Sequence, residues 1–421
     1  MTTVRRDAAR PSTELPGPMG RNAVATMFLA FAVAYFLSAL VRASVATLAP
    51  ALSAELSLTS ADLGLLAGAY FLGFSVMQLP MGIALDRFGP KRVQLSMLVI
   101  AVLGCAGFAL AKTQLGLLTA RFLIGAGVAG CLMAPLTAYR QHMAASAQLR
   151  ANAWMLMVGS LGMLTSTVPV QWAAAISGWR VVFALVAVAL LCSVVLIWIL
   201  VPADPARPTT RAESSGYRDV VSEATFRRLA PLGFSLYGGL VAMQALWIGP
   251  WLTLVVGRTA QEAAWGLLLV NATMMLAFLA WGWLAPRLAQ LGWPVDRVIS
   301  VCWPASVLAL VTILWMGHRA DEHAWAAWCI VTSAINLSQP AVALAQPGRL
   351  AGRALSAYNL VIFIGVFAVQ WGVGLLMDQL LSMGFGRDTS LRLALGFFAL
   401  SVAAAGLWFQ FKRQSPRPGA R

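Results

Sequence analysis

The chain has 421 residues, of which 60% are hydrophobic and 11% are charged, and its formal net charge is +15. Apolar runs of about 20 residues recur along it, which is the length a helix needs to cross about 30 Å of hydrocarbon. This composition strongly disfavours a soluble helical protein, and the alternating pattern of an outer-membrane barrel is absent. We therefore expect an all-α integral membrane protein, because helices satisfy their own backbone groups in lipid.

Twelve membrane spans are predicted where apolar runs are bounded by charged residues, Gly or Pro. In chain order the spans cover residues 22–49, 61–83, 93–111, 115–138, 152–175, 179–201, 229–256, 263–284, 298–317, 324–345, 354–377 and 390–411. A long polar segment separates the sixth span from the seventh. The expected organisation is therefore six helices, a linker and six helices.

Domain boundaries follow from these spans. The first 20 residues are polar and rich in Pro, without the apolar stretch of a signal peptide, so we expect no cleavage there. The predicted parts are a cytoplasmic tail at 1–21, a six-helix bundle at 22–201, a cytoplasmic linker at 202–228, a second six-helix bundle at 229–411 and a cytoplasmic tail at 412–421.

The basic residues predict the orientation of the spans. With the N-terminus in the cytoplasm, the cytoplasmic segments hold 22 Lys and Arg residues and the external segments hold 6. The positive-inside rule then predicts two cytoplasmic termini and a multi-pass protein of a bacterial inner membrane. Because this bias explains most of the net charge, we expect the lipid bilayer and no nucleic acid as a partner.

The two halves match at an offset of 200 residues. The tripeptide LAP at Leu48 meets IGP at Ile248, and GIALDRF at Gly82 meets GWLAPRL at Gly282. These matches indicate an internal duplication. Pseudo-symmetric halves of this kind typically enclose a substrate site near the membrane midplane.

The segment GIALDRFGPKR, residues 82–92, lies in the predicted loop between the second and third spans. Gly82 is expected to allow a close approach of two helices, and Asp86 to cap a neighbouring helix or to pair with Arg. Simple anchoring by basic residues is the alternative, but it leaves Asp86 unexplained. We predict an inner-gate latch formed by Gly82, Asp86, Arg87, Gly89, Lys91 and Arg92.

These motifs resemble the major facilitator superfamily over nearly the whole chain. GIALDRFGPKR resembles its loop signature G-x-x-x-D-R-x-G-x-[RK]-[RK] at each defining position, and RFLIGAGVAG at 121–130 resembles its fourth-helix pattern. GWR at 178–180 opens the sixth helix as in many members. The resemblance implies two pseudo-symmetric six-helix bundles and transport by alternating access, and it names no substrate.

Two arginines are predicted inside spans. Arg42 lies in the first span, where Tyr35 and Ser38 share its helical face, and Arg121 lies in the fourth. All fifteen Asp and Glu residues fall in tails, loops or span ends. Because a buried cation without a partner is costly, this pattern favours an anionic or carboxylate-bearing solute with Arg42 as its partner. Hydrogen bonding of Arg42 to helix carbonyls, or packing on aromatic rings, is the alternative.

A closer resemblance concerns the anion:cation symporter branch of the superfamily. There a first-helix Arg in a similar context is a substrate ligand, which implies this role for Arg42, while the family pattern implies packing and coupling for Arg121. That branch usually has an acidic residue before this Arg, where this chain has Val41, and a proton-linked acid later in the fourth helix, which is missing here. Symport, exchange and efflux therefore all stay open, with or without a coupling ion.

The second half offers neutral candidates for the substrate site. Tyr237, Gln244, Trp247 and Trp251 are predicted to share one face of the seventh span, and Asn359 and Gln370 one face of the eleventh. Buried amides are also expected at Asn271, Asn336 and Gln339. Each amide could equally serve as a hydrogen-bonded link between helices.

No catalytic or metal-binding pattern competes with transport. The three histidines, at 142, 318 and 323, lie at loops or span ends, and the five cysteines show no paired metal spacing. We expect a monomer without cofactor or metal, which is not an enzyme and carries a small, anionic solute as a secondary transporter. An exporter of apolar or cationic drugs and a non-transporting sensor on the same fold are the alternatives.

Overall fold

The computed structural model describes residues 21–143, 145–204, 216–347 and 350–412. Nearly all of the predicted N-terminal tail, the middle of the predicted linker and nearly all of the C-terminal tail lie outside the described residues. The described part is helical throughout, and eleven of its helices are long and apolar enough to cross a membrane, with a bent pair as the twelfth. The predicted all-α membrane fold is thereby confirmed.

The first half contains six spans built from eight helices. They are α1 (Arg21–Leu56), α2 (Ser60–Phe88), α3 (Pro90–Leu110), α4 (Gln114–Val128), α5 (Met133–His142), α6 (Ala145–Thr165), α7 (Val168–Ser177) and α8 (Trp179–Leu200). The fifth span is predicted as one run but consists of α6 and α7, which are bent by 42°. Pro169, in the first turn of α7, explains the break, because proline cannot donate a helical hydrogen bond.

The second half begins inside the predicted linker, with α9 (Gly216–Ser222). Its seventh span joins α10 (Ala224–Leu232), η1 (Gly233–Tyr237), α11 (Gly238–Ala242), η2 (Met243–Trp247), α12 (Ile248–Pro250) and η3 (Trp251–Val255). The next elements are α13 (Ala260–Gln290), α14 (Val295–Met316), η4 (Gly317–Arg319), α15 (Glu322–Thr332), η5 (Ser333–Leu337), α16 (Ser338–Leu344), α17 (Ala351–Ser382) and α18 (Arg387–Phe411). Three π-helical turns, η1, η2 and η3, widen the seventh span.

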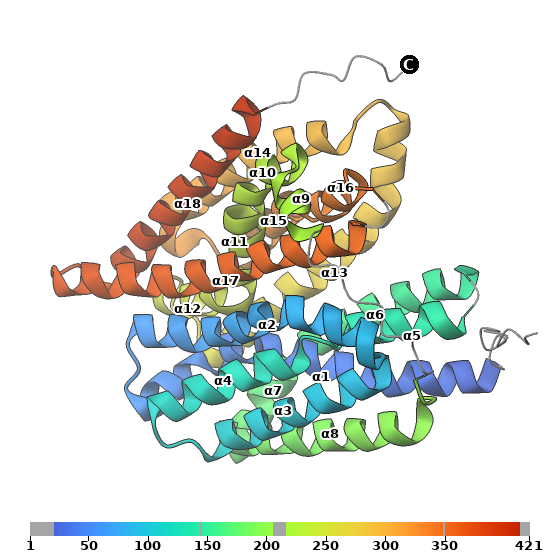
Figure 1. The fold of residues 1–421 in the computed structure, drawn as a ribbon. Coiled ribbons are helices and arrows are strands. Elements are labelled where there is room, and N and C mark those ends of the chain that lie inside the picture. The colour runs from blue at the N-terminus through green and yellow to red at the C-terminus, as the bar shows by residue number, and fades with distance from the viewer. Residues whose placement is uncertain (1–20, 144, 205–215, 348–349, 413–421) are drawn as a thin grey trace, which may run out of the picture.

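The two halves pack as two layers of helices, with α2 and α17 side by side where the layers meet (Figure 1). We call the face at which α1 begins and α18 ends the terminal face. The face that carries the α1–α2 and α17–α18 connections is the opposite face. Because the chain crosses between the two faces an even number of times, the start of α1 and the end of α18 lie on the same face.

The layers are in close contact near the opposite face. A Cβ on Gly374 of α17 would collide with the backbone oxygen of Ser60 in α2, and one on Gly64 would collide with the backbone of Gln370. A Cβ on Gly249 of α12 would lie only 2.7 Å from the backbone oxygen of Ala46 in α1. Glycine therefore permits the contacts that close this face.

A carboxylate reinforces this contact. Asp378, near the end of α17, accepts hydrogen bonds from the backbone N–H groups of Ser60 (3.0 Å) and Ala61 (2.9 Å) at the start of α2. The first amides of a helix have no partner within the helix, and its N-terminus attracts negative charge. Asp378 thus caps a helix of the other half.

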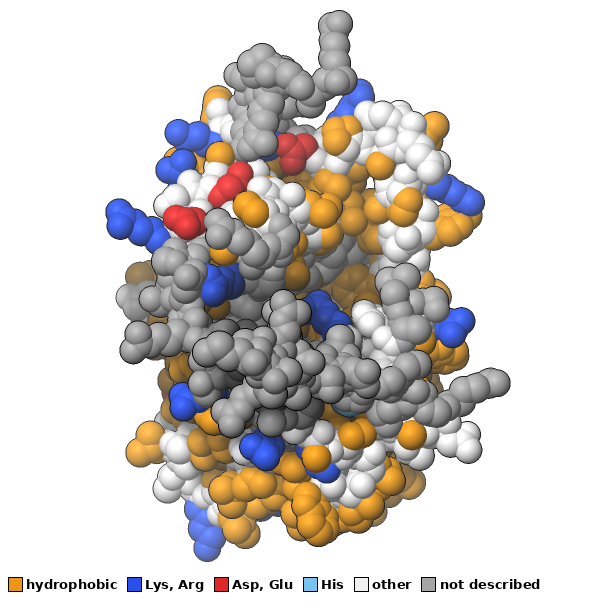
Figure 2. All heavy atoms as spheres, turned by 45° about the vertical axis from the view of Figure 1, so that its right-hand side comes forward, with side chains coloured by type: hydrophobic (Ala, Val, Ile, Leu, Met, Phe, Trp, Pro, Cys, Tyr) orange, Lys and Arg blue, Asp and Glu red, His pale blue; other side chains and the backbone are white. Residues whose placement is uncertain are grey.

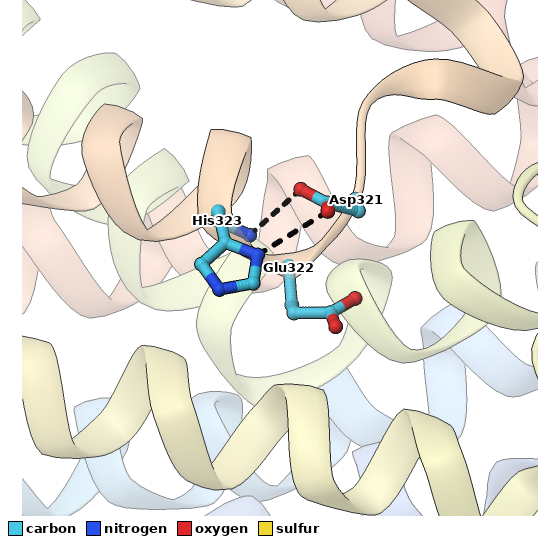
Figure 3. Close-up of side chains that lie close together, drawn as sticks. All are labelled: Asp321, Glu322 and His323. Atoms are coloured by element: carbon cyan, nitrogen blue, oxygen red, sulfur yellow. Dashed lines mark hydrogen bonds and ion pairs between the residues drawn. The ribbon is translucent and has the colours of Figure 1, made fainter.

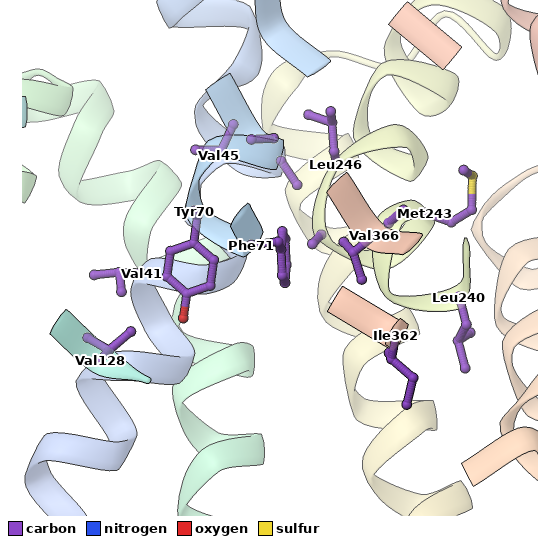
Figure 4. Close-up of a cluster of buried hydrophobic side chains, with 14 of the residues drawn as sticks. Val41, Val45, Tyr70, Phe71, Val128, Leu240, Met243, Leu246, Ile362 and Val366 are labelled. Atoms are coloured by element: carbon purple, nitrogen blue, oxygen red, sulfur yellow. The ribbon is translucent and has the colours of Figure 1, made fainter. Parts of the chain in front are cut away.

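Toward the terminal face, the surface between the layers is hollowed. Figure 2 shows this face brought forward, with Lys and Arg side chains around the hollow. Deeper in, apolar side chains of both layers meet, among them Phe71 from α2 and Val366 from α17 (Figure 4). The ring of Phe71 stacks on Phe363 at a centroid distance of 6.1 Å. The described structure is therefore closed on one face and hollowed on the other.

Candidate functional site

Arg42 lies in the middle of α1, with its side chain half-buried. Its Nε is buried without a hydrogen-bond partner among the described residues, and the guanidinium carbon lies 5.8 Å from the ring centroid of Phe74 in α2. Within the described ranges, no Asp or Glu forms an ion pair with Arg42. The interior thus holds a positive charge whose neighbours are aromatic.

Three tyrosines lie near this guanidinium. Tyr35 comes from α1, Tyr70 from α2 and Tyr237 from η1 in the other half. Tyr70 is fully buried, and its hydroxyl donates to the backbone oxygen of Ser38 at 3.5 Å. The helices therefore bring phenol groups from both halves to Arg42, with the predicted neighbours Tyr35 and Ser38 among the assembled residues.

Arg121 occupies a different environment. It is 0% exposed, and its Nη1 donates to the backbone oxygen of Val41 at 3.0 Å. Its guanidinium carbon lies 5.1 Å from the ring centroid of Tyr70 and 6.0 Å from that of Phe108. Its Nε and Nη2 have no hydrogen-bond partner. Arg121 therefore contacts the backbone directly before Arg42 and, unlike Arg42, is fully buried.

Tyr70 and Phe74 are site residues that sequence reasoning missed. They lie one helical turn apart on α2, and their rings are stacked at 6.2 Å. Phe74 also lies 4.6 Å from Phe363 of α17, so the aromatic contact extends from Arg42 into the second half. Aromatic residues are common in spans, and only the packing of α1 against α2 marks these two as neighbours of the arginines.

The predicted amides form pairs rather than one surface. Gln244 donates to Asn271 at 2.8 Å, and Gln339 donates to Asn359 at 2.5 Å. Asn336 donates to the backbone oxygen of Ser333 at 2.6 Å. These contacts fit the role of links between or within helices.

Gln370 is the exception among the amides. It is 0% exposed, and neither its Oε1 nor its Nε2 has a hydrogen-bond partner in the described structure. It lies on α17, and its backbone is in close contact with Gly64 of α2. A buried amide without partners is costly, which makes Gln370 the strongest polar candidate in the second half.

The π-helical turns change the face expected for the seventh span. Trp251 packs against Trp325 and donates from Nε1 to the backbone oxygen of Ala320 at 2.8 Å, so it contacts α15. Trp247 is 1% exposed, and its Nε1 has no partner. Wider turns rotate successive side chains away from the positions that 3.6 residues per turn predicts.

The predicted loop at 82–92 is helical except at Gly89, because α2 runs to Phe88 and α3 begins at Pro90. The start of α3 is held by an unpredicted residue, Asp204. Its carboxylate accepts from the backbone N–H groups of Lys91 (3.1 Å) and Arg92 (3.0 Å) at the start of α3. The Lys91 ammonium donates to backbone oxygens of α8 and the residue after it, Trp198 and Val201. The loop is therefore joined to the end of the sixth span.

Two glycines of this loop differ in their surroundings. Gly89 has a φ of +83°, and a Cβ there would collide with the side chain of Asp204. A Cβ on Gly82 would meet no atom within 4 Å, so the predicted close approach of two helices at Gly82 is wrong for this conformation. The halves are separated at the terminal face, which leaves this part of α2 uncovered. Arg87 is exposed and stacks on Phe88, and the structure describes the backbone of Asp86 but not its side chain.

On the opposite face, Asp321, Glu322 and His323 lie close together (Figure 3). Asp321 caps α15 by accepting from the backbone N–H groups of His323 and Ala324. Glu322 forms an ion pair with Arg258 at 3.4 Å. Capping and pairing account for this cluster without a metal ion.

A family model described as Major Facilitator Superfamily matches residues 31–370. The chain is 30% identical to a hexuronate transporter of Escherichia coli strain K12 over 34% of the chain and 33% of that protein. It is 28% identical to a probable sulfoacetate transporter of Cupriavidus necator over 35% of each chain. The match to a galacturonate transporter of Dickeya chrysanthemi is 28% identical and covers 34% of the chain and 42% of that protein. Each match thus spans less than half of the relative.

Solved structures extend the likeness over nearly the whole chain. A bacterial homologue of the human lysosomal transporter Spinster aligns with a TM-score of 0.73 and 18% identity, covering 94% of this chain and 100% of the other. A D-xylose-proton symporter aligns with a TM-score of 0.74 and 14% identity, covering 92% and 97%. At these identities the likeness concerns the fold.

Proposed function

The chain belongs to the major facilitator superfamily of transporters, and on this premise we propose that it moves a small organic anion with a carboxylate or similar acidic group across the membrane. The family has no enzymatic activity to explain, so the question is what the interior binds. The observation that carries the proposal is the half-buried guanidinium of Arg42 without a carboxylate partner in the described residues.

Arg42 supplies the recognition chemistry. Its planar guanidinium can donate two parallel hydrogen bonds to a carboxylate or sulfonate, and these charge-assisted bonds are stronger in a site with little water. The hydroxyls of Tyr35 and Tyr237 are suited to hydrogen-bond the rest of the solute, one from each half. We assign the paired amides and Gln370 supporting roles in the second half.

The names of the relatives support an acidic solute. Hexuronate, galacturonate and sulfoacetate are all anions that combine an acidic group with other polar groups. An exporter of cationic drugs has less support. A cationic solute would be repelled by the positive charge of Arg42, whereas a carboxylate at that position would attract it.

We further propose that the terminal face is cytoplasmic, in an inner membrane, and that residues 22–201 and 229–411 move as two bundles. The excess of Lys and Arg in the segments of this face supports that orientation. In this proposal the segment at 82–92 forms part of the gate on the cytoplasmic side, and Asp204, which follows the sixth span, holds its α3 end.

Binding of organic acids to the purified protein tests this function. Thermal shift in detergent against galacturonate, glucuronate and sulfoacetate is expected to show a rise in melting temperature for at least one anion. Arg42→Gln is expected to weaken that binding by about 10- to 100-fold, because it removes charge-assisted hydrogen bonds worth about 1.5–3 kcal/mol.

The matched control is Arg319→Gln, which removes one positive charge from an exposed position on the opposite face. It is expected to bind like the unmodified protein. Equal binding by the Arg42→Gln protein, or no stabilisation by any organic anion, would contradict the proposed function.

A further inference from the structure

We infer that this transporter is an obligatory anion exchanger: its central site passes between the two faces only when an anion occupies it. The inference rests on the proposed function and adds its mode of coupling. Three observations carry it, namely the charge of the empty site, the chemistry of the groups around it and the electrical consequence of moving it.

The first observation is the charge of the empty site. Arg42 has no carboxylate partner within the described ranges, and its Nε is buried without an acceptor. When the two halves close over this site, water leaves the guanidinium. The Phe74 ring at 5.8 Å and the tyrosine hydroxyls stabilise a cation less than water or an anion does. An empty, closed site is therefore disfavoured, and a bound carboxylate removes the penalty.

The second observation is that, among the described side chains, Arg42 has no acid beside it that could take up a proton or a sodium ion to balance this charge. The titratable groups that face it are Tyr35, Tyr70, Tyr237 and Cys131, which are ordinarily neutral at physiological pH. Val41, which precedes Arg42, is fully buried, and Val128 of α4 lies with it beside Tyr70 (Figure 4). All Asp and Glu residues of the chain lie in tails, loops or span ends. Proton-coupled return of an empty site thus has no group to use.

The third observation concerns the membrane potential. After uptake, an empty site that returns from the cytoplasmic to the external side would carry the charge of Arg42 outward, against an inside-negative potential. A monovalent anion cancels the charge of Arg42, so the return of the filled site no longer carries that charge against the potential. In a cycle that exchanges one anion for another of equal charge, the site never returns empty. Such a cycle therefore avoids both the desolvation of Arg42 and the movement of its charge against the potential.

Proteoliposomes containing the full chain provide the test. Uptake of radiolabelled galacturonate is measured into vesicles loaded with unlabelled galacturonate and into vesicles without it. Exchange predicts at least about 10-fold faster uptake into loaded vesicles. It also predicts no change in that rate when a potassium diffusion potential or a pH gradient is imposed.

Uptake into unloaded vesicles that is driven by a pH or sodium gradient at the rate of exchange would overturn the inference and leave the proposed function intact. Absence of both binding and flux for galacturonate, glucuronate and sulfoacetate would overturn both. The two failures are thus distinguished by whether flux occurs in the unloaded vesicles.

A conformational measurement tests the same inference without flux. Spin labels at Lys112→Cys and His318→Cys, exposed positions of the two halves on the opposite face, report its opening once the five native cysteines are replaced by alanine. Without an anion we expect one distance, and with galacturonate a second, longer one. Arg42→Gln is expected to show both distances without an anion. Two distances that interconvert in the anion-free protein with Arg42 intact as fast as in the presence of galacturonate would overturn the inference.

Discussion

Arg121 donates a hydrogen bond of 3.0 Å to the backbone oxygen of Val41, the residue that directly precedes Arg42. Arg121 of α4 thus holds the turn of α1 that carries Arg42. Arg42 is half-buried and lacks an ion-pair partner in the described structure, whereas Arg121 is fully buried within the first half. This relationship makes Arg121 a positioning residue for Arg42.

We therefore predict that Arg121→Met and Arg121→Lys differ. Met removes the donor to Val41 and is expected to lower the melting temperature and to weaken anion binding together, since a buried acceptor loses a charged partner worth about 1.5–3 kcal/mol. Lys retains a donor and is expected to restore part of both. Loss of binding in the Met variant at an unchanged melting temperature would instead identify Arg121 as a direct ligand of the anion.

The second prediction concerns the contact between the halves across the site. Tyr237 of η1 lies near Arg42 of α1. Tyr237→Phe is expected to weaken anion binding by about 5- to 10-fold, the effect of one hydrogen bond, and to leave the melting temperature of the anion-free protein unchanged. Titration of both proteins with the same anion measures this difference.

Tyr139→Phe is the matched control for Tyr237→Phe. The Tyr139 hydroxyl is buried without a hydrogen-bond partner, so its removal is expected to leave anion affinity unchanged. Equal effects of the two substitutions would mean that Tyr237 contributes no hydrogen bond to the anion.

Arg42 could be predicted from the sequence, whereas its surroundings could not. A charged residue inside an apolar run is conspicuous, and the absence of acids from the spans is a property of composition. Tyr70 and Phe74 carry no such signal, because their role depends on how α1 packs against α2. Likewise, the twelve spans follow from apolar length, but the π-helical turns that move Trp251 toward α15 do not.

The same limit applies to the carboxylates. Their positions at span ends follow from the sequence, and Asp86 is the acid that the loop motif emphasises. Two other acids cap helix N-termini that are distant in the chain: Asp204 holds α3, and Asp378 holds α2 from the other half. Both partners are more than 100 residues away in the chain, and no local pattern encodes such pairs.

The third prediction tests the glycine contact on the opposite face. Gly374→Ala places a methyl group against the backbone oxygen of Ser60, whereas Gly372→Ala, on the same helix, meets no atom within 4 Å. The backbone cannot move aside as a flexible side chain can. We therefore expect overpacking to destabilise this contact by about 1–3 kcal/mol in Gly374→Ala and not in Gly372→Ala. Spin-label distances on the opposite face are expected to lengthen in that variant and to stay unchanged for Gly372→Ala. Identical distances in both variants would contradict a tight contact.

The fourth prediction concerns pH. Partial burial raises the pKa of Asp321, but hydrogen bonds from the His323 side chain and from the backbone N–H groups of His323 and Ala324 outweigh it and hold that pKa below its ordinary value. A lowered carboxyl pKa in the folded state stabilises the fold above the ordinary pKa, and this stabilisation is lost as pH falls through the folded value. Asp321→Ala is expected to cost about 1 kcal/mol near pH 7, as an N-cap does. The difference in melting temperature should shrink as pH falls below the ordinary pKa of an Asp carboxyl, and a difference that stays constant with pH would contradict this role.

The last prediction addresses Asp378. Its carboxylate accepts two backbone hydrogen bonds at the start of α2, and this contact can exist only while the halves are closed at the opposite face. Asp378→Asn removes the charge and one acceptor oxygen, and a cap of this kind contributes about 0.5–2 kcal/mol. The population open at the opposite face is therefore expected to rise by about 2- to 30-fold, measured with spin labels at Lys112→Cys and His318→Cys. Asp388→Asn, which removes an exposed charge from the same face, is expected to leave the distances unchanged. If Asp378→Asn also leaves them unchanged, the closed face is held by the glycine contacts alone, and the carboxylate only caps the helix.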